Sequence, residues 1–101
     1  MLGRRGRNVI KSFADKDTES IFHQEYVKGI PQDIQKRALR KLIMIDAAKE
    51  DKDFRVPPGN HFEHLQGDRL GQVSIRVNDQ YRICFKIKSN DCYDVELVDY
   101  H

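Results

Sequence analysis

The sequence has only two cysteines, three prolines and no tryptophan in 101 residues. Cys84 and Cys92 show neither a CxxC spacing nor a cluster with histidines, which excludes the usual zinc-binding patterns. We therefore predict two reduced thiols, and no metal or other cofactor.

Long apolar runs are also missing. No stretch approaches the roughly 20 apolar residues that a membrane-spanning helix needs, and no signal peptide is visible. We expect a cytoplasmic protein without a membrane partner.

Neither charge is in large excess, since 18 Lys and Arg are balanced by 16 Asp and Glu for a net charge of +2. This balance does not by itself predict nucleic-acid binding, so the question is whether the cations are segregated in space. The length allows one domain with one modest core. We assign residues 9–101 to that domain, and residues 1–8 to a flexible basic N-terminal extension.

Hydrophobic spacing predicts a helical first half. We expect a strand over 9–13, a first helix from Asp15 or Asp17 to Gly29, and a second helix over 31–45. The outer face of the second helix carries four cations, which are Lys36, Arg37, Arg40 and Lys41. We interpret them as an ordinary solvated face, with nucleic-acid contact as the alternative.

The second half predicts β-structure. Residues 49–60 are expected to form a charged loop, broken by prolines, before a change to alternating apolar residues. Four strands are predicted, at 61–65, 73–77, 81–87 and 93–97. The sequence thus predicts an α+β domain in which two N-terminal helices pack on a small, mainly antiparallel twisted sheet.

Turn length predicts the register of the two hairpins. A three-residue turn at 78–80 pairs Ile75 with Ile83, so the apolar residues share one face. A second three-residue turn, at 89–91, pairs Ile87 with Tyr93.

The first of these turns also sets Arg76 opposite Arg82. Like charges directly across a sheet are unfavourable, so an anion such as phosphate between them would explain the pair. Neutralisation by an acid such as Asp94 or Glu96 is the alternative.

The second hairpin brings the last three residues, Asp99, Tyr100 and His101, to the rim of the arginine-bearing face beside Gln80. A carboxylate, a phenol and an imidazole near a phosphate are suited to proton transfer. RNA cleavage by its own 2′-hydroxyl needs a base, an acid and cations that stabilise the charged phosphorane. By spacing alone, a frayed and inert chain end is the alternative.

Several motifs occur in an ordered set along the chain. They are Ile10–Phe13, Leu65–Gly71, Ser74–Val77, Tyr81–Phe85 and Val98–His101. Together they resemble the HigB branch of the RelE toxin superfamily. Pro57–Asn60 and Val77–Gln80 also resemble GraT-like toxins.

The resemblance implies the toxin of a type II toxin–antitoxin system. Such a toxin is a ribosome-dependent endoribonuclease that cuts mRNA in the decoding site of the 30S subunit, and a HigA-like antitoxin with a helix-turn-helix domain neutralises it. By motif position, Arg82 is expected to hold the scissile phosphate and Gln80 to contact the codon. Asp99, Tyr100 and His101 match the terminal functional residues of the family.

Two further arginines are expected to contact RNA. Arg76 joins Arg82 in binding phosphate, and Arg69, in a Gly-Asp-Arg turn, adds a contact to phosphate or ribosomal RNA. Aromatic stacking on Tyr100 fits the way proteins hold unpaired bases.

The chain departs from the pattern of some HigB proteins at Glu63, where those have a histidine. Neighbouring strand residues point to opposite faces, so the adjacent His64 does not simply replace that group. Three possibilities stay open: Glu63 is a base, His64 reaches the site through an irregular strand, or the site relies on His101. GraT-like chains share the glutamate, which implies a weaker or differently tuned nuclease.

Two rival functions belong to other classes. One is a non-catalytic module that binds the ribosome or RNA, and the other is a purely structural subunit.

Overall fold

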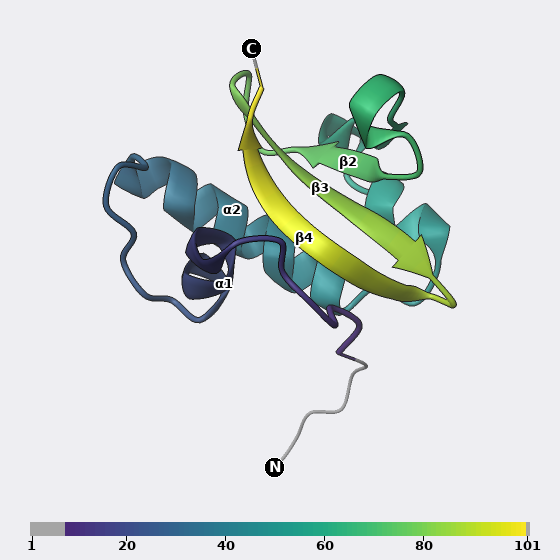
Figure 1. Ribbon diagram of the computed structural model, residues 1–101, viewed down its shortest axis with the longest axis horizontal. Helices are drawn as coiled ribbons and strands as arrows, with labels where there is room; N and C mark the ends of the chain where they lie inside the picture. The colour runs from purple at the N-terminus through teal and green to yellow at the C-terminus, as the bar shows by residue number, and fades with distance from the viewer. Residues whose placement is uncertain (1–7, 101) are drawn as a thin grey trace.

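The computed structural model describes residues 8–100, so most of the predicted N-terminal extension and His101 lie outside the described residues. The α-helices and strands of this part are α1 (Lys16–Phe22), α2 (Gln32–Asp46), β1 (Glu63–His64), β2 (Val73–Arg76), β3 (Tyr81–Lys88) and β4 (Asp91–Asp99). The strands form one antiparallel sheet in the order β1-β2-β3-β4. Figure 1 shows α2 crossing behind this sheet. The predicted α+β architecture is therefore confirmed.

Helix α1 ends earlier than predicted. Gln24 adopts a left-handed φ of 64°, and the backbone N–H of Glu25 donates to the carbonyl of Ser20 at 2.9 Å. This is the arrangement of a Schellman cap, which ends a helix. The prediction that the helix runs past Tyr26 to Gly29 is wrong, and the Tyr26 side chain is exposed instead.

Helix α2 begins at Gln32, because Pro31 occupies the cap position rather than the first turn. Most of its predicted apolar face is buried, but Ile43 of the predicted set is exposed. The innermost residues are Ala38, Leu42 and Ile45. These side chains join one core cluster with the inward residues of β2 and β3. The helix therefore covers one face of the sheet and leaves the other face for function.

The buried Gln35 ties the α1–α2 connection to α2. Its Nε2 donates to the carbonyls of Val27 (2.7 Å) and Ile30 (2.6 Å), and its Oε1 accepts from the backbone N–H of Val27 at 3.1 Å. One side chain thus satisfies three backbone groups of a loop that has no regular structure.

The segment 9–13 runs parallel to β4 but forms only two isolated bridges, Ile10 with Cys92 and Phe13 with Val95. Between these bridges the hydroxyl of Ser12 accepts from the backbone N–H of Asp94 at 2.9 Å. The predicted strand is therefore wrong, because the irregular backbone of β4 interrupts the ladder. Figure 1 shows the segment, in dark purple, leading past β4 into α1.

The first hairpin has the predicted register, with Ile75 opposite Ile83 and Arg76 opposite Arg82. Asn78 closes its turn, since its Oδ1 accepts from the backbone N–H groups of Gln80 (2.9 Å) and Tyr81 (2.7 Å).

The second hairpin is different near its turn. Lys88 pairs with Asp91, so the loop has two residues, and both have positive φ angles of 53° and 67°. Such a pair of left-handed residues is typical of a type I′ turn. Tyr93 therefore pairs with Lys86 rather than with Ile87, and that part of the predicted register is wrong.

A bulge at Asp94, whose φ is 54°, takes up the extra residue. Beyond the bulge the predicted pairing returns, and Ile83 faces Leu97 while Arg82 faces Val98.

The predicted loop after α2 contains two 3-10 turns, η1 (Asp51–Arg55) and η2 (Pro58–Asn60). It also supplies a core residue, since Phe54 is buried and its ring packs on Phe85 with centroids 5.2 Å apart.

Both cysteines are free and buried, as the prediction of reduced thiols requires. Burial raises the pKa of Cys92 to about 12. Within residues 8–100 the longest helix has 15 residues, and none combines the length and apolarity that crossing a bilayer demands.

Replacing Gln35 by leucine is expected to lower the free energy of unfolding by about 2–4 kcal/mol, because the loop loses partners for three backbone groups. Chemical denaturation followed by circular dichroism measures this change. The matched control is Gln32→Leu, at an exposed position of the same helix, with an effect within about 0.5 kcal/mol. Equal effects of the two substitutions would contradict the assigned role.

Candidate functional site

The site lies on the sheet face that points away from the helices. Because side chains alternate along a strand, Ser74 and Arg76 of β2 share this face with Arg82 and Cys84 of β3, to which they are paired. We call it the arginine face. Its two arginines stand directly opposite each other, as the turn at 78–80 predicts.

Arg82 is the better-enclosed arginine, with a side chain that is 12% exposed. Its Nε donates to the hydroxyl of Ser74 at 2.8 Å, and its Nη2 donates to the backbone carbonyl of His61 at 2.5 Å. The carboxylate of Glu63 lies 3.5 Å from the same Nη2. These contacts fix the guanidinium in one orientation.

The neighbouring Arg76 is paired with Asp79, an exposed carboxylate of the hairpin turn. The two acids considered as neutralising partners for the arginines are engaged elsewhere. Asp94, at the bulge of β4, lies 3.3 Å from the ammonium of Lys86. Glu96 forms an ion pair with Arg69. Each arginine therefore has an acid partner, as the alternative proposed, but the acids are Asp79 of the turn and Glu63 of β1 rather than Asp94 and Glu96.

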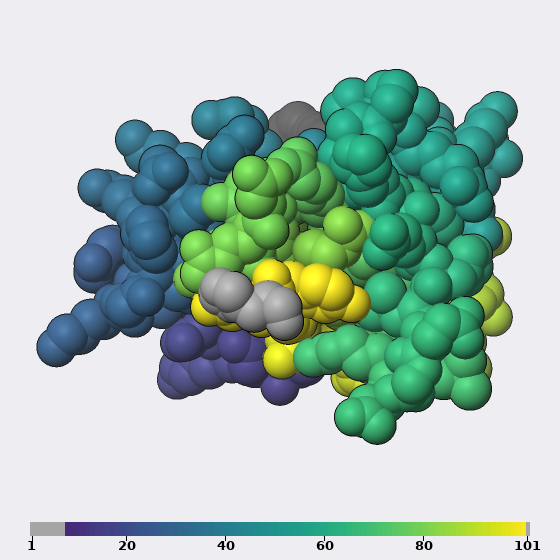
Figure 2. Space-filling view, turned by 90° about the horizontal axis from the view of Figure 1, so that it is seen from above, coloured from purple at the N-terminus to yellow at the C-terminus, as the bar shows by residue number. Residues whose placement is uncertain are grey.

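The end of β4 meets the arginine face at the β2–β3 turn. Asp99 pairs with Tyr81, and the backbone N–H of Tyr100 donates to the carbonyl of Gln80 at 2.6 Å. The Gln80 side chain donates to the carboxylate of Asp99 at 3.2 Å. Figure 2 shows the end of the chain, in yellow, bordered by this light-green turn and by the darker green segment before β2.

Tyr100 reaches back over the arginine. The residue is 40% exposed, and its ring centre lies 5.9 Å from the guanidinium carbon of Arg82. The structure therefore brings Tyr100 to Arg82, beside Arg76 and Glu63. It also joins Gln80 to Asp99 at the rim of the arginine face. Another predicted residue, His101, lies outside the described residues.

On β1, the side chains of Glu63 and His64 lie on opposite faces of the sheet. Glu63 pairs with Ser74 of the arginine face, whereas His64 pairs with the inward-facing Val73. The His64 ring packs edge-on against Phe62, with centroids 5.4 Å apart. The structure thus places Glu63, and not His64, beside Arg82.

Arg69 borders the same face but is already paired. Its Nη1 lies 3.2 Å from the carboxylate of Glu96 and donates to the side chain of Gln72 at 3.0 Å. Cys84 is buried nearby, and burial raises the pKa of its thiol. Arg69 is thus paired with Glu96 much as Arg82 is paired with Glu63, and its side chain is 31% exposed, against 12% for Arg82.

The fully buried Asn60 holds the segment that carries the His61 carbonyl. Its Nδ2 donates to the carbonyls of Phe54 (3.0 Å) and Val56 (3.2 Å), and its Oδ1 accepts from the ammonium of Lys41 on α2. His61 follows in a left-handed conformation, with a φ of 45°. Asn60 therefore secures the backbone to which the key arginine is bonded.

Two of the groups that hold Arg82, Ser74 and the His61 carbonyl, were not predicted from the sequence. Ser74 has a recognisable signal, because it is a small polar residue between two buried apolar ones and shares the face of Arg76. The His61 carbonyl has no such signal, since a backbone acceptor does not depend on residue type.

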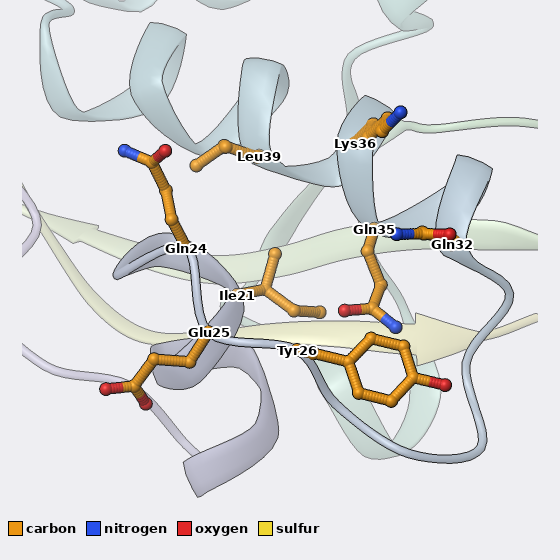
Figure 3. A pocket seen from close by; sticks show the side chains of 8 residues that line it. All are labelled: Ile21, Gln24, Glu25, Tyr26, Gln32, Gln35, Lys36 and Leu39. Carbon is orange, nitrogen blue, oxygen red and sulfur yellow. The ribbon is translucent and has the colours of Figure 1, made fainter.

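A separate groove of about 260 Å³ lies between α1 and α2. Figure 3 shows Ile21 and Tyr26 on one side of it and Leu39 and Lys36 on the other. It contains none of the predicted site residues.

Three comparisons relate the chain to known proteins. A family model described as the RelE-like toxin of type II toxin–antitoxin system HigB matches residues 11–101. The chain is 45% identical over 75 residues to Toxin HigB-1 of Vibrio cholerae serotype O1, covering 73% of this chain and 79% of that protein. It is 32% identical over 98 residues to Endoribonuclease HigB of Proteus vulgaris, covering 92% and 100%.

A solved structure, the YoeB-YefM complex from Staphylococcus aureus, contains a chain with the same fold. The TM-score is 0.53 at 16% identity, and the match covers 91% of this chain and 97% of that one.

Asn60→Ala is expected to lower the free energy of unfolding by about 2–4 kcal/mol, because two buried carbonyls lose their donor. Thermal and urea denaturation measure the change. Asn8→Ala, at an exposed position, is the control with an effect within about 0.5 kcal/mol. A loss below 1 kcal/mol for Asn60→Ala, roughly the worth of one ordinary hydrogen bond, would show that the buried amide does not hold this segment.

Proposed function

The chain belongs to the HigB family of RelE-like toxins from type II toxin–antitoxin systems, and on this basis we propose that it is an endoribonuclease that cleaves mRNA on the ribosome. The observation that carries the proposal is the fixed guanidinium of Arg82. Within residues 8–100, its Nη1 has no hydrogen-bond partner while Nε and Nη2 are held. A phosphate oxygen can accept from Nη1 without disturbing the other contacts.

The reaction is an attack by the 2′-oxygen of a ribose on the adjacent phosphorus. The bond from phosphorus to the 5′-oxygen breaks, which leaves a 2′,3′-cyclic phosphate and a 5′-hydroxyl. A base takes the 2′ proton, an acid protonates the departing 5′-oxygen, and Arg82 stabilises the added negative charge.

Glu63, Asp99, Tyr100 and His101 are the proposed proton-transfer groups. Glu63 is 57% exposed and lies beside Arg82, so its carboxylate can accept a proton from a ribose held there. Tyr100 lies over Arg82, and Asp99, which pairs with the inward-facing Tyr81, is held at the rim by Gln80. His64 is not included, because it lies on the opposite side of β1.

The exposed rim of the arginine face, at Tyr100 and Gln80, is suited to a single-stranded RNA substrate. The partly exposed Tyr100 ring offers a surface on which an unpaired base can stack, and Gln80 stands next to it with an amide suited to a base edge. Arg76 adds a second cation for the neighbouring phosphate. A message lying in the decoding site of the 30S subunit, in the cytoplasm, provides such a strand.

Membership of a toxin–antitoxin family implies an antitoxin partner. We propose a HigA-like antitoxin with a helix-turn-helix domain in that role.

Arg82→Gln is expected to reduce cleavage of ribosome-bound mRNA at least a hundredfold, because the developing charge loses its main cation. Primer extension on programmed ribosomes measures the rate at each cut. The matched control is Arg55→Gln, which removes an exposed arginine that packs on Phe62 outside the site. Ribosome binding without any cut by the wild-type protein would instead identify a non-catalytic binding module.

His101→Ala and Glu63→Gln are expected to slow cleavage by about 10²–10⁴-fold where the lost group transfers a proton. The variant that lacks the base also loses the rise of the rate with pH. Single-turnover rates across a pH series measure both effects. Unchanged rates and pH profiles in both variants, or undiminished cleavage by a chain truncated before Asp99, would rule out the proposed proton-transfer groups.

A further inference from the structure

A second group of cations surrounds a hollow between α2 and the β2–β3 hairpin. The hollow has a volume of about 350 Å³. Four cations line it, and they are Arg37, Arg40, Lys41 and Arg76. The rest of the lining consists of Met44, Gly59 and Val77 and contains no carboxylate.

The three cations of α2 lie on one side of the helix, at spacings that bring side chains close together. No described residue forms an ion pair with any of them. Among residues 8–100, the hydrogen-bond partner of Lys41 is the neutral amide of Asn60. Burial lowers the pKa of Lys41, and the charges of Arg37 and Arg40 lower it further. The group therefore carries mutual repulsion that no carboxylate among the described residues offsets.

Arg76 lines the hollow from the β2–β3 hairpin. Its partner Asp79 has a side chain that is 97% exposed. Exposed pairs of this kind contribute little to stability, so an incoming anion can replace the carboxylate at small cost. Arg76 also faces Arg82 across the β2–β3 ladder, so the hollow adjoins the proposed cleavage site.

We propose that this hollow binds the backbone phosphates of RNA. The inference rests on the proposed function for its substrate class and extends the RNA contact from the arginine face to α2. Guanidinium groups match phosphate oxygens with two parallel hydrogen bonds, and three of the four cations are arginines. The solvated-face interpretation of the α2 cations is thereby replaced for Arg37, Arg40 and Lys41. It is kept for Lys36, which lines the groove on the other side of the helix (Figure 3).

Two sources can supply these phosphates, the message itself and ribosomal RNA. Because the chemistry is the same, the experiment needs one arm for each. The first arm uses a single-stranded oligoribonucleotide that is 2′-O-methylated throughout, so that it cannot be cleaved. The second arm uses purified 30S subunits without message.

The test compares the double variant Arg37→Gln, Arg40→Gln with a matched double variant, Lys28→Gln, Lys36→Gln. Both remove two exposed positive charges from the helical half of the protein. Thermal denaturation verifies that each variant is folded. Fluorescence anisotropy gives the dissociation constant in each arm over a range of salt concentrations.

The arginine variant is expected to bind roughly 10- to 100-fold more weakly at about 50 mM salt, and its salt dependence in the oligonucleotide arm becomes shallower by about 1.4 in log–log slope. Loss in the first arm assigns the hollow to the message, and loss in the second arm alone assigns it to ribosomal RNA. Equal losses for the arginine and lysine variants in both arms would overturn the proposal. Because the oligonucleotide is uncleavable, this outcome is independent of whether the protein cuts mRNA.

Discussion

The register of the β2–β3 hairpin is the constraint on which the rest of the site depends. One turn, closed by Asn78, determines which residue of β3 stands opposite each residue of β2. A slip by one residue would turn Arg82 toward the helices and expose the apolar residues that form the core. The core and the arginine face are therefore specified together, since the register that pairs the buried Ile75 and Ile83 also opposes the two arginines.

The same constraint accounts for the electrostatics. The native sheet holds two arginines across from each other, and each is given a partner from outside the β2–β3 ladder, Glu63 for Arg82 and Asp79 for Arg76. The carboxylate of Asp79 is 97% exposed, so an anionic substrate can displace it from Arg76. Arg82 keeps Ser74, the His61 carbonyl and Glu63 as partners and offers Nη1 to the substrate. A guanidinium held in this way is already oriented when the substrate arrives, which is the condition for effective stabilisation of developing charge.

Sequence patterns predicted the parts of this arrangement that depend on local periodicity. The buried face of α2, the first hairpin and the convergence of Gln80, Arg82 and the end of β4 all follow from spacing and turn length. The second hairpin shows the limit of such predictions. One extra residue can be placed either in a longer turn or in a bulge of β4, and the alternation of apolar residues does not distinguish the two. In the structure the bulge at Asp94 holds it. The supports of Arg82 were not predictable for another reason, since they depend on how the segment after α2 folds back, and the decisive acceptor is a backbone carbonyl.

The central claim is that Arg82 holds the phosphate at which mRNA is cut. The most direct test is a structure of the protein on ribosomes programmed with mRNA that is 2′-O-methylated in the decoding site. The account predicts the scissile phosphate within hydrogen-bond distance of the Arg82 guanidinium, with Tyr100 against a neighbouring base. A scissile phosphate held by other residues, with Arg82 still bound only to Ser74, His61 and Glu63, would contradict it.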